Sequence, residues 1–208
     1  MTYEQQKRLL DLIVATLLII AFLPFWILIP LLIILDSGLP ILFQHKRIGK
    51  GGREFEINKF RSMVPGAHEL LHKKNKRLLQ KFKEGDWKIA AKDDPRITRL
   101  GRLLRALTID EFPQLFNVLK GEMSMVGPRA YMKSELAEQT KKYPETRRYI
   151  QKILSVKPGI TGPWQTSGRN EIPFKDRAKM DAQYASNLSI MKDIQILLRT
   201  PKAMISKW

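Results

Sequence analysis

The chain has 208 residues, which is enough for one globular domain with a substantial core and an appended segment. Its 37 Lys and Arg residues outnumber its 20 Asp and Glu residues, and the net charge of +17 indicates an anionic partner: nucleic acid, an anionic membrane surface or a phosphorylated substrate. Because the chain has no cysteine, disulfides and thiolate metal sites are excluded, which is compatible with a reducing compartment.

An uncharged apolar run covers residues 12–35 and predicts insertion into a membrane. The run is too long for the apolar region of a cleavable signal peptide, and such uniform runs are rare in the core helices of soluble domains. As one helix it would reach about 36 Å, which exceeds the roughly 30 Å hydrocarbon core of a bilayer. Pro24 lies in the middle of the run and lacks a backbone donor, so we expect the helix to kink or break there.

Basic residues lie on both sides of this run: Lys7, Arg8, His45, Lys46, Arg47 and Lys50. Positive residues mark the cytoplasmic side of a membrane segment, and here both ends carry that mark. A re-entrant helix-break-helix bent at Pro24 satisfies both flanks, whereas a kinked spanning helix is the alternative. We therefore predict a membrane hairpin over residues 1–36 and a cytoplasmic domain over residues 37–208, with both termini cytoplasmic.

The domain begins with residues 41–43 and 55–58, which are typical of short strands on either side of the turn IGKGGR. A charged helical insert with one apolar side is predicted next, over about residues 65–90. After the sequence DDPR, arginines recur every three residues and predict a helix with one slowly drifting cationic stripe: Arg96, Arg99, Arg102 and Arg105. The last segment, residues 190–208, is amphipathic and basic, and it predicts a helix that lies on a membrane surface or packs onto the domain.

Two adjacent carboxylates, Asp110 and Glu111, stand in the stretch LTIDEFPQ of this basic chain. One interpretation is structural, because Thr108 and Glu111 fit a capping box at a helix start, where acidic residues also suit the helix dipole. The other is chemical, because one carboxylate can attack phosphorus while its neighbour binds Mg²⁺, which prefers carboxylate and phosphate oxygens.

Two glycine-rich loops favour the chemical interpretation. MVGPR brings Arg129 out of a rigid Gly-Pro turn, and KPGITGPWQTSGRN contains three glycines and ends near Arg169. Backbone N–H groups in such loops and the forked donors of arginine suit phosphate oxygens. Each loop alone is typical of an ordinary turn, but together with the arginine stripe and the carboxylate pair the loops predict a site of phosphate chemistry.

These segments resemble the bacterial sugar transferases and, more narrowly, are similar to their monotopic phosphoglycosyl transferases. The resemblance rests on the apolar hairpin, on KFRSM, on DDPRITRLGRLLRALTIDEFPQLFNVLKGEMSMVGPR and on KPGITGPWQTSGRN. It covers nearly the whole chain. Larger members of the family carry a preceding block of spanning helices, and this chain resembles the minimal catalytic unit.

The resemblance implies a mostly helical α/β fold, with a re-entrant membrane helix broken at Pro24 and a small cytoplasmic domain whose amphipathic helices rest on the inner leaflet of the bacterial cytoplasmic membrane. It implies transfer of a sugar 1-phosphate from a UDP-sugar to undecaprenyl phosphate, with UMP as the other product, as the first membrane step of surface glycan assembly. By the same resemblance, Asp110 forms a covalent phosphosugar intermediate, and Glu111 supports it; the pair would hold Mg²⁺.

The resemblance also implies a set of residues that contact the substrate or its phosphates: Lys59, Arg61, Arg105, Pro128, Arg129, Gln165, Arg169 and Asp181. The chain departs from the commoner family patterns at Ala130, which replaces the last Pro of GPRP, and at Pro163, which precedes Trp164; both lie beside the charged positions. Galactose, glucose and N-acetylated sugars stay open for the donor, and a homodimer stays open for the assembly. Nucleic acid is not expected as a partner.

Two rival interpretations stay open. A non-catalytic, membrane-tethered protein that binds anionic lipid or nucleic acid would share the charge and the apolar segment, but it would give Asp110 and Glu111 no role. A direct, single-step transferase would use the same pair only to hold Mg²⁺.

Overall fold

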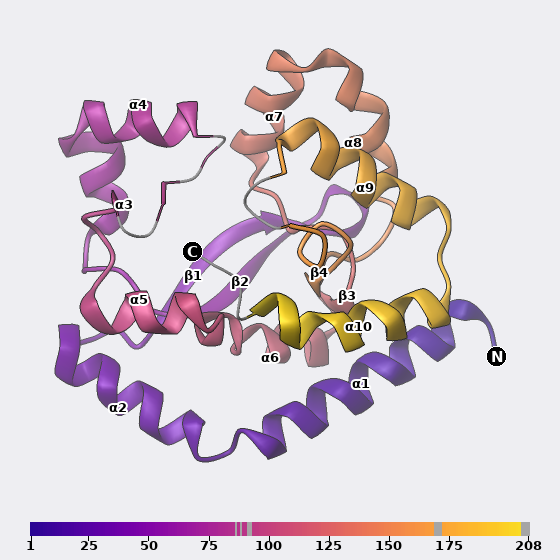
Figure 1. The fold of residues 1–208 in the computed structure, drawn as a ribbon, viewed down its shortest axis with the longest axis horizontal. Coiled ribbons are helices and arrows are strands. Elements are labelled where there is room, and N and C mark those ends of the chain that lie inside the picture. The colour runs from indigo at the N-terminus through magenta and orange to yellow at the C-terminus, as the bar shows by residue number, and fades with distance from the viewer. Residues whose placement is uncertain (86, 88, 91–92, 169–171, 205–208) are drawn as a thin grey trace.

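A computed structural model describes residues 1–85, 87, 89–90, 93–168 and 172–204. The described part of the chain is mostly helical and includes two small two-stranded sheets. This confirms the predicted class of a mostly helical α/β protein (Figure 1).

The predicted break at Pro24 separates two helices. Helix α1 (Tyr3–Ala21) and helix α2 (Phe25–Ser37) are bent by 64° relative to each other, and Pro24 directly precedes α2. Within the described residues no helix by itself has both the length and the hydropathy to cross a membrane, although α1 and α2 taken together across their bend do. We call α1 and α2 the bent pair; it forms the open V at the bottom of Figure 1.

The first half of α1 is built into the core of the domain. The Arg8 guanidinium donates to the carbonyls of Val118 and Leu119 at 2.6 and 2.7 Å. The Asp11 carboxylate is 2% exposed and accepts a hydrogen bond from Ser124. Arg8, one of the basic residues before the apolar run, is thus hydrogen-bonded to the domain.

The far end of the bent pair is anchored to the same domain. Arg61 donates from one guanidinium nitrogen to the Ser37 carbonyl at 2.8 Å and to the Gly38 carbonyl, at the C-terminal end of α2. Both ends of the pair therefore attach to one domain, and the bend, which is the lowest point of the view in Figure 1, packs on the domain through Phe22 and Phe112.

The predicted strands form an antiparallel hairpin. Strand β1 (Leu42–Ile48) pairs with β2 (Glu54–Phe60), from Leu42 opposite Phe60 to Ile48 opposite Glu54. The predicted turn IGKGGR connects them, and it contains the short 3₁₀ segment Lys50–Gly52.

The charged insert is helical as predicted, but it is interrupted. It consists of α3 (Ala67–Glu69), a π-helical turn (Leu70–Lys74) and α4 (Lys76–Glu84). The interruption falls at Asn75, whose side chain accepts from the Leu78 N–H at 2.9 Å and so caps α4. Leu71 and Leu78 are buried, and Lys83 on α4 forms an ion pair with Glu138 at 2.9 Å.

The predicted arginine stripe is only partly correct. Helix α5 (Arg99–Ala106) starts at Arg99, so Arg96 lies outside it. Arg96 is 5% exposed and makes a two-pronged pair with Asp94, at 2.7 and 2.8 Å. The stripe therefore lacks its first member, because burial of an ion pair, which the three-residue spacing cannot reveal, decides where Arg96 lies.

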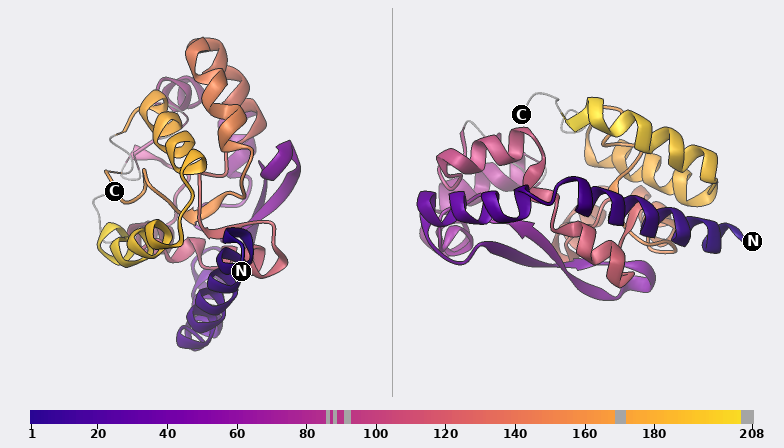
Figure 2. Two further views of the ribbon diagram at one scale, coloured as in Figure 1. Left: turned by 90° about the vertical axis from the view of Figure 1, so that its right-hand side faces the viewer. Right: turned by 90° about the horizontal axis from the view of Figure 1, so that it is seen from below.

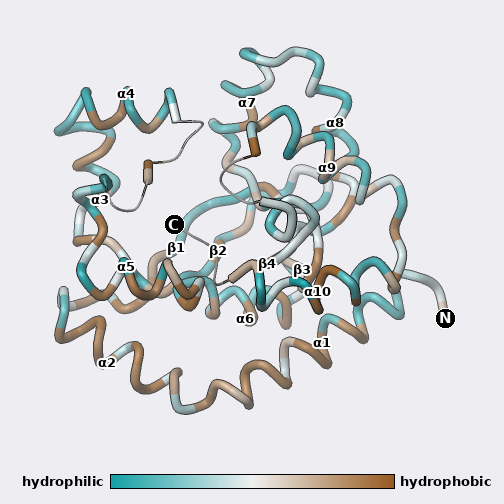
Figure 3. Tube along the Cα trace, viewed as in Figure 1, coloured by the Kyte–Doolittle hydropathy of each residue, from teal (hydrophilic) through white to brown (hydrophobic). Residues whose placement is uncertain are grey.

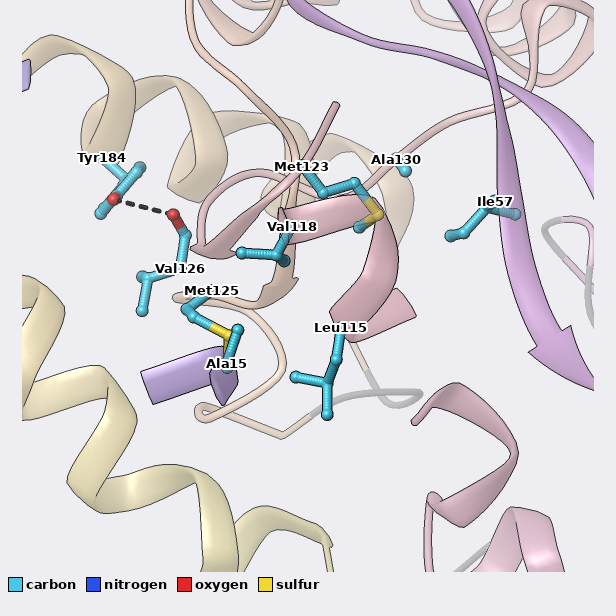
Figure 4. Packing of buried hydrophobic residues seen from close by; sticks show 9 residues of the cluster. All are labelled: Ala15, Ile57, Leu115, Val118, Met123, Met125, Val126, Ala130 and Tyr184. Atoms are coloured by element: carbon cyan, nitrogen blue, oxygen red, sulfur yellow. Dashed lines mark hydrogen bonds between the residues drawn. The ribbon is translucent and has the colours of Figure 1, made fainter. Parts of the chain in front are cut away.

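The remaining elements comprise a second, parallel sheet and the helices around it. They are α6 (Gln114–Lys120), β3 (Ser124–Val126), α7 (Lys133–Lys142), α8 (Arg147–Ile153), β4 (Gly159–Thr161), α9 (Phe174–Ser186) and α10 (Ile190–Met204). Strand β3 pairs with β4, with Ser124 opposite Gly159 and Val126 opposite Thr161. The largest core cluster lies between this sheet, α1, α6 and α9, and the Tyr184 hydroxyl donates into it to the Val126 carbonyl (Figure 4).

Apolar side chains gather on one side of the molecule. In Figure 3 the brown, hydrophobic colour predominates on the bent pair and recurs on α5 and α10, whereas teal predominates on α7 and α8 at the opposite side. Helix α10 packs onto the domain, which is one of its two predicted roles: Leu197 packs toward the core, whereas Met191 and Leu198 are 63% and 76% exposed.

Candidate active site

A tight turn between α5 and α6 carries the two carboxylates. Thr108 has a left-handed backbone conformation (φ 58°), and Asp110 and Glu111 follow in the 3₁₀ segment Ile109–Glu111. The capping-box interpretation is wrong, because the Thr108 side chain makes no capping hydrogen bond and the Thr108 N–H donates to the Arg105 carbonyl. A β-branched residue in this conformation is uncommon and is found where the surrounding structure holds a strained turn, as at functional sites.

Burial sets the protonation of Asp110. Asp110 is 5% exposed, and burial raises the pKa of its carboxyl group to about 6. The nearby Lys59 ammonium lowers this pKa, the neighbouring Glu111 carboxylate raises it, and Arg105 lowers it further. Asp110 is therefore mostly ionised at neutral pH, and its pKa lies only slightly below neutral pH.

Glu111 has a different environment. Its carboxylate accepts a hydrogen bond from the Lys59 ammonium at 2.6 Å, and both side chains are about a quarter exposed. Asn117 on α6 fixes the strand that carries Lys59, because its amide oxygen accepts from the Asn58 backbone and its amide nitrogen donates to the Glu56 carbonyl. The completely buried Asn117 thus locks β2 to α6 and sets Lys59 beside the carboxylates.

One cleft of about 1830 Å³ contains both carboxylates and most of the predicted phosphate contacts. The predicted residues that line it are Lys59, Arg61, Arg105, Asp110, Glu111, Arg129 and Gln165. Its walls come from the hairpin β1–β2, the insert, α5, the loop after β4, α1 and α10. Residues far apart in the sequence therefore converge on one space, as the phosphate-site prediction requires.

Arg105 and Arg61 face this cleft under different restraints. The Arg105 guanidinium donates to the Ser62 hydroxyl at 2.8 Å and feels the charge of Asp110. Arg61 is committed through one nitrogen to the end of α2. This favours a phosphate contact for Arg105 and a structural tie for Arg61.

Arg129 is positioned by several buried groups. Its N–H donates to the Asp181 carboxylate at 3.1 Å, and its guanidinium lies 5.6 Å from the centre of the Trp164 ring. Arg177 lies 5.5 Å from the centre of the same ring, so two guanidinium groups are within cation–π distance of Trp164. The Glu135 carboxylate lies 4.0 Å from the Arg129 side chain.

Asp181 lies behind Arg129 and not on the cleft wall. It is fully buried, also accepts from the Tyr131 hydroxyl at 3.3 Å, and burial raises its pKa to about 7. This position favours support of the Arg129 backbone over direct contact with substrate. Pro128 is likewise structural, since its carbonyl accepts from the Gly159 N–H at 2.8 Å, and Arg169 lies outside the described residues.

The glycines of the two loops serve close packing. The Gly127 N–H donates to the Thr161 carbonyl at 2.9 Å, so it is used between the loops. A Cβ atom on Gly159 would lie 2.0 Å from the Gly127 nitrogen, and one on Gly162 would lie 2.2 Å from the Gly127 carbonyl oxygen. The prediction that these loops offer their N–H groups to phosphate is corrected for Gly127 and Gly159: their glycines let β3 and β4 meet backbone to backbone.

Sequence reasoning missed the residues that support the charged groups. Ser62 lies inside the motif KFRSM, so its position beside Arg61 was a usable signal. Glu135, Asn117 and the contacts of Trp164 with two arginines had no such signal, because these contacts join segments that are distant in the sequence.

The donor set fits Mg²⁺. The ion is commonly held by one or two carboxylates together with substrate phosphate oxygens and water, and Asp110 and Glu111 supply such a pair on a cleft wall. Within the described residues no group of three or more acidic or histidine side chains forms a complete protein site for a metal. The remaining ligands would therefore come from the donor's phosphates and water.

The chain matches a known family along its length. The model of the family described as bacterial sugar transferase matches residues 2–207. The chain is 40% identical over 194 residues to a UDP-galactose-lipid carrier transferase of Erwinia amylovora, covering 93% of this chain and 39% of that relative.

Two further relatives differ in length. The chain is 38% identical over 203 residues to an undecaprenyl-phosphate galactose phosphotransferase of Salmonella typhimurium, covering 97% of this chain and 40% of the relative. It is 36% identical over 200 residues to the exopolysaccharide production protein ExoY of Sinorhizobium fredii, covering 95% of this chain and 84% of the relative. The chain thus spans about two fifths of the first two relatives and most of the third.

Proposed function

Because this chain belongs to the bacterial sugar transferase family, we propose that it moves a sugar 1-phosphate from a UDP-sugar to undecaprenyl phosphate and releases UMP. This reaction is the first membrane step in assembly of a surface glycan. The observation that carries the proposal is the carboxylate pair itself: a buried Asp110 and a Lys59-bound Glu111 share one cleft with Arg105 and Arg129. The names of the relatives support the choice of donor and acceptor.

Asp110 is the proposed nucleophile. Its carboxylate oxygen attacks the phosphorus that bears the sugar, an oxygen–phosphorus bond forms, and the bond from that phosphorus to UMP breaks. An oxygen of the acceptor phosphate then attacks the same phosphorus, which releases Asp110 as a carboxylate and leaves a lipid diphosphate sugar. Burial supports this role, because a partly desolvated carboxylate with a pKa near 6 is both ionised at neutral pH and poorly shielded by water.

The neighbouring cations hold the phosphates. Lys59, Arg105 and Arg129 face the cleft, and fixed positive groups stabilise the charge that develops on a transferring phosphoryl group. Asp110 and Glu111 would hold Mg²⁺, which supplies neutralisation of the donor diphosphate's charge. Glu111 also forms an ion pair with Lys59, which holds the Lys59 ammonium at this side of the cleft.

The bent pair is the proposed re-entrant membrane segment. Both of its ends bind the same domain, through Arg8 at the start of α1 and through Arg61 at the end of α2, and this supports re-entry over a kinked spanning helix. The exposed apolar side chains of α1, α2 and α10 support a position on the inner leaflet of the cytoplasmic membrane, with both termini cytoplasmic. Such a seat brings a lipid-borne phosphate to the cleft.

The test is UMP release from a panel of UDP-sugars by purified protein with Mg²⁺ and undecaprenyl phosphate. We expect acceptor-dependent release from at least one donor, and a loss of about a thousandfold or more for Asp110→Asn, since removal of a nucleophile leaves only binding and electrostatic contributions. If Asp110→Asn retains wild-type turnover, the nucleophile is another group. If no donor is used while anionic lipid or nucleic acid still binds, the non-catalytic alternative holds.

A further inference from the structure

We propose that the groove between α1 and α10 holds the apolar chain of the acceptor, with the acceptor's phosphate at the Asp110–Glu111 end. This rests on the proposed function, because it assumes that the acceptor is a polyprenyl phosphate. The ligand assigned to this wall of the cleft is an isoprenoid chain with a phosphate at one end.

The two facing walls of the groove are apolar. Helices α1 and α10 contribute the following side chains to the lining of the cleft: Val14, Leu18, Phe22, Leu197, Thr200, Pro201 and Met204. Thr200 is the one polar side chain in this set from the described residues, and its hydroxyl is engaged by the Thr161 hydroxyl at 2.8 Å and by the Ile196 carbonyl at 2.7 Å. Covering this apolar surface with an apolar ligand is favourable, whereas the surface offers few hydrogen-bonding groups to a sugar or a nucleotide.

The groove is held open by contacts at both ends of α10. At its start, the Asp193 carboxylate accepts from the Tyr3 hydroxyl at 3.0 Å and lies 3.3 Å from the Lys7 ammonium, so α10 is fixed beside the start of α1. At its far end, Thr200 is fixed to Thr161 on β4. From their shared start the two helices diverge toward their C-terminal ends, as both Figure 1 and Figure 2 show.

The groove leads to the carboxylates. Phe22, at the break of the bent pair, lies with its ring centre 4.8 Å from that of Phe112, the residue that follows Glu111. The cations Lys59, Arg105 and Arg129 line the same cleft. A space that is apolar along one arm and cationic at its inner end matches an amphiphile with an anionic head and an apolar chain.

The outer arm of the groove ends among exposed apolar residues. Leu17 on α1 is 60% exposed, and Leu23 at the break is 61% exposed. A chain that leaves the groove here remains in contact with the apolar surface that the protein presents to the bilayer. The long acceptor therefore needs no displacement from the membrane to bring its phosphate to Asp110.

Photolabelling of the full chain in lipid nanodiscs tests this placement without any turnover. The probe is a polyprenyl phosphate that carries a diazirine in the isoprene units nearest the phosphate, and a phospholipid with the same diazirine in its acyl chain is the control probe. We expect the polyprenyl probe to label residues 14–22 and 197–204, and excess undecaprenyl phosphate to suppress this labelling. Equal labelling by the control phospholipid, or labelling that undecaprenyl phosphate does not suppress, would overturn the proposal.

A matched pair of variants adds a kinetic test. Leu197→Gln places an amide in the groove, whereas Leu198→Gln makes the same change on the outward side of α10, where it affects only the exposed surface. We expect Leu197→Gln to raise the KM for undecaprenyl phosphate about tenfold relative to Leu198→Gln, because a buried polar group without a partner is costly. Equal KM values in the two variants would place the chain elsewhere.

The outcomes separate the two proposals. Specific labelling of the groove together with no UMP release from any donor would retain the groove and reject the proposed reaction. UMP release together with unspecific labelling would retain the reaction and reject the groove.

Discussion

Asp110 and Glu111 are neighbours in the sequence, but the fold gives their carboxylates different surroundings. Asp110 is buried and its pKa is raised to about 6, whereas Glu111 is partly exposed and bound to Lys59 at 2.6 Å. Two acidic groups whose environments differ in this way can take different roles at one site. The buried one suits nucleophilic attack, and the ion-paired one suits support of the phosphate charge and of a metal ion.

The ionisation of Asp110 predicts a pH dependence of the first chemical step. Only the carboxylate can attack phosphorus, so the rate of UMP release in a single turnover without acceptor should rise with pH and reach half of its plateau at about pH 6. Lys59 lowers the pKa of Asp110 and Glu111 raises it. Lys59→Met should therefore move the acidic limb to higher pH, and Glu111→Gln should move it to lower pH.

The position of the limb, and not the height of the plateau, is the readout, because both variants also weaken phosphate or metal binding. Rapid-quench measurement of UMP across the pH range gives this position. Limbs at the same pH in the wild type and in both variants would mean that a group other than Asp110 titrates.

At this scale the sequence predicted the charged residues of the cleft but not their supports. The pair of carboxylates and the arginines are visible as residue types in an unusual context. The exclusion of Asp181 from the cleft wall and the commitment of Arg61 to the end of α2 follow from burial and tertiary contacts. No local pattern reports such contacts, so the predicted contact set mixed residues that face the cleft with residues behind it.

The pairing of β3 with β4 is the element that brings Arg129 and the loop after β4 together. Gly159 lies where a Cβ atom would meet the backbone of Gly127 at 2.0 Å, so any side chain must force the strands apart. We predict that Gly159→Ala lowers the free energy of unfolding by about 3 kcal/mol or more, a loss of the size that overpacking of a buried site causes.

Gly52 offers a matched control for this substitution. It has a left-handed backbone (φ 78°) but open space around it, so Gly52→Ala should cost only the conformational penalty of about 1–2 kcal/mol. Thermal unfolding of both variants in detergent gives the comparison. Equal losses of stability would mean that β3 and β4 do not depend on their close approach.

Elements with a local signal were predicted well. The break at Pro24 follows from a missing backbone donor, and the hairpin β1–β2 follows from a glycine-rich turn between two apolar runs. The interruption of the insert at Asn75 and the exclusion of Arg96 from α5 were not predicted, because a side-chain cap and a buried ion pair outweigh the helical pattern there.

For the whole molecule, the attachment of both ends of the bent pair to one domain predicts the membrane topology. The chain has no cysteine, so single cysteines report accessibility without background. Thr2→Cys, before α1, and Glu145→Cys, on the exposed surface near α8, should both react with a membrane-impermeant reagent only after the cytoplasmic face is opened. Labelling of Thr2→Cys in intact cells, with Glu145→Cys protected, would require a spanning helix.

The central claim is that Asp110 carries the sugar phosphate between donor and acceptor. The most direct measurement is intact-protein and peptide mass spectrometry after incubation with Mg²⁺ and a UDP-sugar that supports turnover, without acceptor. We predict a mass increase of one sugar phosphate on the peptide that contains Asp110, its loss when undecaprenyl phosphate is added, and its absence in Asp110→Asn. Turnover with acceptor but no adduct at any time would contradict the covalent route and favour direct transfer.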